Sequence, residues 1–143
     1  MAKRKKTTVA QEVEKSAKLL QRLVRLKASD DNGYCKCVTC GKIDHYKSMQ
    51  GGHFIPRGRT VFKLYEPNIQ VQCPSCNLWG MKQAHYVLRY RQWMVDYYGE
   101  RRVKAMERLA WRASPKFNLD EVIEFAKELK KQIKEQEWRI GEI

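Results

Sequence analysis

The chain has 143 residues, 43% hydrophobic and 31% charged, which fits one domain or one compact core with helical extensions. Its formal net charge of +13 favours a polyanionic partner, usually nucleic acid. A basic membrane-surface protein is the competing interpretation. No apolar run approaches the roughly 18 residues of a membrane span. Residues 1–6 are basic but lack the apolar stretch of a secretory signal, so we expect a cytoplasmic protein with reduced thiols.

Helical patterns flank a middle segment of different character. The first pattern covers 8–29, and its apolar stripe is Val9, Val13, Ala17, Leu20 and Val24, widened by Leu19, Leu23 and Leu26. Residues 34–77 instead suggest short strands and glycine-rich turns. Further helices are expected from Asn77 to Tyr98, over about 101–112, and from the N-cap Asn118 onward. The sequence thus predicts an α+β chain with a basic N-terminal helix at 1–33, a core at 34–98 and a C-terminal helical region at 99–143, forming one compact unit.

Positive charge is concentrated away from the C-terminal helix. Residues 1–29 carry nine Lys or Arg against two acids, and 78–112 carry eight against three, whereas 115–143 carry six against seven. The last helix also has an apolar stripe, formed by Leu119, Val122, Ile123, Ala126, Leu129 and Ile133. We expect this helix to pack on protein, either its own chain or a second copy in a homodimer.

Two Cys-x-x-Cys knuckles, Cys37/Cys40 and Cys73/Cys76, bracket the middle of the chain. Each spacing lets two thiolates approach one ion from a tight turn, and four sulfurs form a closed, structural Zn²⁺ site. Cys35 is then left over, because Cys-x-Cys makes a poorer knuckle. We expect the zinc to pin the ends of a segment too short to bury a core by itself.

Three polar residues, two between the knuckles and one directly after the second, are candidates for a functional site. His53 precedes an apolar pair and a turn, Asn68 opens the run before the second knuckle, and Asn77 directly follows Cys76. This order closely resembles the strand–loop–strand–helix pattern of HNH, or ββα-metal, nucleases. The resemblance implies that His53 is the general base, that Asn68 braces the loop, and that Asn77 ligates a catalytic Mg²⁺ or Mn²⁺.

These residue types suit phosphodiester hydrolysis. A histidine can deprotonate water near neutral pH, and a hard cation held by an amide oxygen can neutralise the phosphate. The chain departs from the commonest family pattern at Gly52, where an Asp or His often supplies a second metal ligand. Asp44, His45 or Gln50 are possible replacements; alternatively, Asn77, phosphate and water hold the ion.

The resemblance narrows further to the phage NinG/Rap recombination nucleases. It rests on 51-Gly-Gly-His-Phe-54 with 57-Arg-Gly-58, on 68-Asn-Ile-Gln-70, and on 72-Gln-Cys-73 with 76-Cys-Asn-77. It covers about residues 34–135 and implies a structure-specific endonuclease for branched DNA such as Holliday junctions and D-loops. A homodimer would suit the two symmetry-related cuts of a four-way junction.

The DNA contacts are expected from basic residues near this constellation: Arg57, Arg59, Lys82, Arg89 and Arg91. Two other interpretations remain open at this point. One is a non-catalytic zinc-ribbon DNA-binding protein, which has no need of His53. The other is an HNH nuclease or nickase of the restriction, homing or packaging type.

Overall fold

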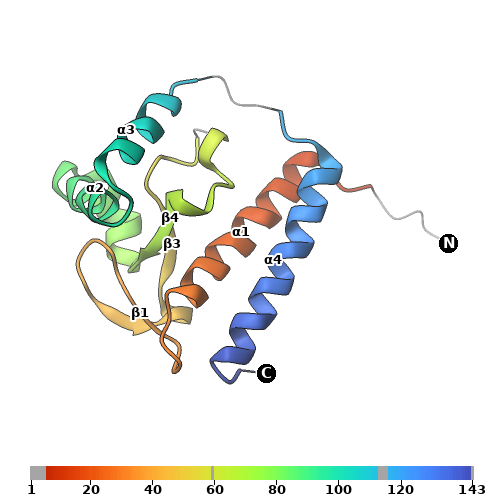
Figure 1. Cartoon of the computed structure of the whole chain (residues 1–143), viewed down its shortest axis with the longest axis horizontal. Coiled ribbons are helices and arrows are strands. Elements are labelled where there is room, and N and C mark those ends of the chain that lie inside the picture. Colours follow the sequence, from red (N-terminus) through yellow and green to blue (C-terminus); the bar gives the residue numbers. More distant parts are fainter. Residues whose placement is uncertain (1–5, 59, 113–115, 143) are drawn as a thin grey trace.

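The computed structural model describes residues 6–58, 60–112 and 116–142 (Figure 1). The helices are α1 (Val9–Lys27), α2 (Ala84–Tyr98), α3 (Glu100–Leu109) and α4 (Leu119–Arg139), and the strands are β1 (Tyr34–Lys36), β2 (Ile43–His45), β3 (Gln50–His53) and β4 (Ile69–Gln72). The α+β class expected from the sequence is confirmed. None of the helices in the described part combines the length and apolarity that crossing a membrane requires.

The strands form two separate antiparallel hairpins, β1–β2 and β3–β4. In the second hairpin His53 pairs with Ile69 and Gly51 pairs with Val71. Helix α1 lies directly on this hairpin. A Cβ on Gly51 would stand only 2.8 Å from the Gln21 Cβ and 2.9 Å from the Gln21 Cα. Glycine at position 51 therefore lets the helix approach the strand that carries His53.

Helices α1 and α4 lie side by side and run in the same direction (Figure 1). The buried stripe of α4 consists of Val122, Ala126, Leu129 and Ile133. At its end, Arg139 donates to the carbonyl oxygens of Leu26 and Ser29, both at 2.9 Å, which fastens α4 to the C-terminal end of α1. The apolar stripe of α4, which predicted packing on protein, therefore packs on α1 of the same chain.

A second apolar core lies beneath α2 and α3. The loop after β3 contributes Phe54, Ile55 and Phe62, and the two helices contribute Tyr90, Met94, Val103 and Met106. The first core instead joins α1, the cysteine knuckles, β4 and α4. The β3–β4 hairpin and its loop contribute to both cores, so both help to fix the loop that leaves His53.

The expected continuous helix from Asn77 to Tyr98 is wrong. Residues Ser75–Trp79 form a π-helical turn, Gly80–Lys82 a 3₁₀ turn, and Gln83 is extended, with φ −117° and ψ 131°, before α2 begins. The backbone here continues from the second knuckle, where the Asn77 amide donates to the Cys73 carbonyl at 3.0 Å. Asn77 therefore sits on a short turn whose position is set by the cysteine cluster.

Candidate functional site

The two cysteine knuckles meet in one cluster. The Sγ atoms of Cys37, Cys40, Cys73 and Cys76 all lie within 4.8 Å of one another, and those of Cys40 and Cys73 are 3.7 Å apart. Sulfurs in a tetrahedron around zinc at about 2.3 Å stand about 3.8 Å from one another. The cluster can therefore hold one structural zinc ion, as the spacing predicts.

Zinc is bound by thiolates, so metal binding must remove the protons of these thiols. Burial and the neighbouring Cys73 and Cys40 thiols raise the pKa of Cys76 well above its ordinary value. A cation among the sulfurs offsets that cost by stabilising the thiolates. Cys35 lies outside the cluster, and burial raises the pKa of its thiol as well, so it stays protonated in the core.

His53 ends β3 and is half-buried. Its Nε2 lies 3.3 Å from the carbonyl oxygen of Lys63. Because that oxygen can only accept, Nε2 carries the proton and Nδ1 keeps its lone pair. Burial, the largest effect, lowers the pKa of His53, so the imidazole is neutral at pH 7 with Nδ1 available to take a proton.

Asn68 braces the loop between β3 and β4 from inside. Its Oδ1 accepts from the Ile55 amide at 2.8 Å, and its Nδ2 donates to the carbonyls of Ile55 at 3.0 Å and Phe62 at 3.3 Å. The side chain is completely buried. Asn68 thus holds the backbone two residues after His53 in place, which is a positioning role.

Replacing Asn68 with alanine is expected to destabilise the fold by about 3 kcal/mol, because buried backbone groups at Ile55 and Phe62 lose their partner. Thermal or urea unfolding of the zinc-loaded variant measures the loss. Asn32→Ala, in an exposed turn, serves as the control. A variant as stable as the wild type would show that water replaces the amide without cost.

Asn77 and His53 line the same cavity of about 250 Å³, together with Gln21, Gly51, Arg57 and Met81. An adjoining cavity of about 240 Å³ shares Gln21, Gly51 and Asn77 and adds Arg25, Met49 and Gln50. The Asn77 Nδ2 donates to Gln50 Oε1 at 2.7 Å. The structure thus brings His53 and Asn77 to one hollow, with Asn68 behind the loop that forms its wall.

Of the five basic residues expected at DNA, Arg57 lies at this hollow. Its guanidinium donates to both carboxylate oxygens of Glu14, at 2.7 and 2.9 Å. Arg91 is paired with Glu107 of α3 at 2.8 Å and so ties two helices together. The remaining positions are Lys82 and Arg89, both exposed on the turn and helix after Asn77, and Arg59, which lies outside the described residues.

The histidines other than His53 lie elsewhere. His45 belongs to β2, where its Nδ1 accepts from the Lys47 amide at 3.3 Å and its Nε2 stands 3.8 Å from Glu142. His85 is exposed in the first turn of α2 and packs on the Tyr86 ring. Asp44 is also on β2, 3.9 Å from Lys42. Of the three replacements considered for the missing Gly52 side chain, only Gln50 lines either cavity.

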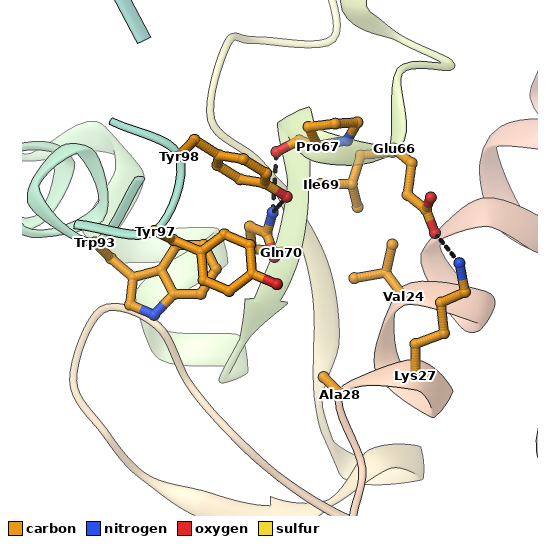
Figure 2. Close-up of a pocket in the computed structure, with 10 residues that line it drawn as sticks. All are labelled: Val24, Lys27, Ala28, Glu66, Pro67, Ile69, Gln70, Trp93, Tyr97 and Tyr98. Atoms are coloured by element: carbon orange, nitrogen blue, oxygen red, sulfur yellow. Dashed lines mark hydrogen bonds and ion pairs between the residues drawn. The ribbon is translucent and has the colours of Figure 1, made fainter. Parts of the chain in front are cut away.

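A larger cavity, of about 380 Å³, lies between α1, β4 and the end of α2 (Figure 2). On one side the rings of Trp93 and Tyr97 stack in parallel, with centroids 5.0 Å apart. On the other side Lys27 binds the Glu66 carboxylate at 2.9 Å. Among the described residues, its lining includes no histidine or cysteine, and the Glu66 carboxylate is paired.

Three glutamines lie near Asn77, and the sequence singles out two of them: Gln50 as a possible second ligand and Gln72 beside Cys73 in the family pattern. Gln21 comes from α1 and Gln50 from β3, while Gln72 lies opposite Gln50 on β4. Only the register of the hairpin and the approach of α1 bring them together.

Comparison with known proteins identifies the family. No curated protein and no solved structure gives a significant match to the chain. A family model described as the bacteriophage lambda NinG protein matches residues 1–138, nearly the whole sequence. This chain belongs to the bacteriophage lambda NinG family.

Proposed function

We propose that this protein is a metal-dependent endonuclease of the ββα-metal class that hydrolyses phosphodiester bonds in branched DNA. The observation that carries the proposal is the shared cavity of His53 and Asn77 beside a four-cysteine cluster. The order of the parts supports it: His53 on β3, Asn68 bracing the loop, and Asn77 on the turn after β4. This order resembles that of the ββα-metal nucleases.

The chemistry of the cavity fits hydrolysis by an activated water. His53 Nδ1 takes a proton from the water, whose oxygen bonds to phosphorus while the bond to the 3′ oxygen breaks. The products are a 5′-phosphate and a 3′-hydroxyl, which takes its proton from solvent. Burial lowers the pKa of His53 below the ordinary histidine pKa of about 6.5. The base therefore stays neutral to a lower pH than a free histidine does.

The groups around Asn77 suit a hard divalent cation. The Asn77 NH₂ group donates to Gln50 at 2.7 Å. The Asn77 carbonyl oxygen is then left to bind a metal, and Mg²⁺ and Mn²⁺ prefer such oxygen ligands. A cation bound there would neutralise the phosphate and stabilise the departing 3′ oxygen. Arg57, at the rim of the same cavity, adds positive charge for the phosphate when DNA displaces Glu14.

Branched DNA is proposed as the substrate because of the resemblance to the phage recombination nucleases, and the +13 charge supports a DNA partner. A two-fold dimer would place two such cavities on symmetry-related strands of a junction. The apolar stripe of α4 is buried on α1, so the dimer rests on this symmetry argument. Light scattering with and without a junction tests it.

The purified, zinc-loaded chain should cut a four-way junction in Mg²⁺ or Mn²⁺ and leave it intact in EDTA. A linear duplex of the same sequence is the matched substrate and should be cut much more slowly. Equal cutting of both would indicate an HNH nuclease with a different target. Binding of the junction without cutting under any of these conditions would favour the non-catalytic zinc-ribbon protein.

Asn77→Ala should raise the Mn²⁺ concentration for half-maximal cleavage by about tenfold or more, because the amide oxygen that ligates the cation is removed. At saturating Mn²⁺ much of the rate should return. Metal titrations of junction cleavage measure the shift. Gln83→Ala, an exposed amide in the same segment, should leave the titration unchanged, and an equal curve for Asn77→Ala would remove Asn77 from the cation site.

A further inference from the structure

Two carboxamide oxygens converge on Gly52. A Cβ built on this residue would lie 1.8 Å from Gln72 Oε1 and 3.0 Å from Asn77 Oδ1. Both oxygens therefore lie close to the Gly52 α-carbon, on the side where a side chain would stand. Gln72 comes from β4, where it pairs with Gln50 and lies diagonally across from Gly52. Its side chain takes up room that any residue with a side chain at position 52 would need.

Each of the two amides is held in the orientation that presents its oxygen. The Gln72 Nε2 donates to Thr39 Oγ1 at 2.9 Å, and the Asn77 Nδ2 donates to Gln50 Oε1 at 2.7 Å. The NH₂ groups of the two amides are thus bound by Thr39 of the first knuckle and by Gln50 of β3. As a result, both carbonyl ends point to the same place.

The Gln72 oxygen has no hydrogen-bond partner among the residues that the structure describes. The Gln72 side chain is completely buried, with an exposed fraction of 0%. A buried carbonyl oxygen left without a donor is costly, and such groups are rare in native proteins. An oxygen that is oriented and buried but unpaired indicates a ligand at that point.

We propose that Gln72 is the second protein ligand of the catalytic cation, its Oε1 acting together with Asn77 Oδ1. This inference rests on the proposed function. Gln72 then takes the place of the side chain that Gly52 lacks, supplied from the neighbouring strand. Two neutral amide oxygens occupy only two coordination positions and add no charge, so the cation keeps positions for water and the DNA phosphate.

Direct Mn²⁺ binding tests the inference without any cleavage. The zinc-loaded full chain is titrated with Mn²⁺ in the absence of DNA, and free Mn²⁺ is measured by electron paramagnetic resonance. Gln72→Met keeps the length of the side chain without its amide and should weaken binding about tenfold or more. Gln72→Glu adds a charged oxygen at the same place and should tighten it. Gln70→Met, two residues earlier on β4, removes an amide that bonds Pro67 and Tyr98 and should change nothing.

The outcomes separate this inference from the proposed function. Equal Mn²⁺ affinity of wild type and Gln72→Met would mean that an ordered water alone fills the site, and the inference fails even if the wild type cuts DNA in Mn²⁺. If Gln72→Met does not fold, Gln72→Glu decides, and unchanged or weaker binding there overturns the inference. Wild-type protein that binds no more Mn²⁺ than Asn77→Ala also overturns it. Cleavage by the wild type, with and without EDTA, reports separately on the nuclease activity.

Discussion

Replacing His53 with alanine is expected to slow junction cleavage by about 10²–10⁴-fold, because the group that deprotonates the attacking water is lost. DNA affinity and stability should hardly change. His53 is half-buried, and the hydrogen bond of its side chain to the Lys63 carbonyl is long at 3.3 Å. The loss should therefore appear in kcat and not in substrate binding. Single-turnover cleavage and binding by anisotropy, on the same junction, measure the two quantities.

Two further variants separate base catalysis from structure. His53→Gln can still donate to Lys63 but cannot act as a base, so it should be as inactive as His53→Ala. His85→Ala removes an exposed histidine on α2 and should cut at the wild-type rate. Cleavage by His53→Ala at the wild-type rate would eliminate His53 as the base and with it this active site.

The parts of the site that depend on local sequence could be predicted. The paired cysteine spacing gave the four-sulfur cluster, because two tight turns that share one ion must meet in space. Asn118 was expected to cap α4, and its Oδ1 indeed accepts from the Glu121 amide at 3.2 Å. For Asn68 the resemblance to the nuclease family implied a bracing role, and its side chain makes three hydrogen bonds to the loop. For the cysteines and for Asn118, the residue type and its position in the chain determine the contact.

The parts that depend on packing between distant elements could not. Gln72 stands beside Cys73 in the family pattern, but the role proposed for it follows only from the β3–β4 register and from the absence of a side chain on Gly52. The break in the helix after Asn77 arises because the knuckle, and not helical periodicity, sets the backbone there. The α4 stripe fitted either α1 or a second subunit until the structure placed it on α1. The charge on a helix cannot distinguish between those two partners.

The other large effect is expected from the cysteine cluster. Cys76→Ser should lose zinc and unfold the segment from 34 to 77, because the cluster is part of the first apolar core and joins β4 to the first hairpin. In structural zinc sites the metal-binding free energy, on the order of 10 kcal/mol or more, is also folding free energy. Few domains of this size are stable by more than that. Metal analysis should therefore find about one zinc per wild-type chain and much less in the variant, with loss of near-ultraviolet circular dichroism.

Cys35→Ser is the matched control, because Cys35 is equally buried but lies outside the cluster. It should keep the full zinc content and a cooperative unfolding transition, at a modest cost from placing a hydroxyl in the core. Cys37→Ser, from the other knuckle, should behave like Cys76→Ser, since both knuckles hold the same ion. The Asn77 turn begins at the second knuckle, so zinc loss should also abolish Mn²⁺ binding. A well-folded Cys76→Ser protein that contains no zinc and still binds Mn²⁺ would contradict a structural metal in this cluster.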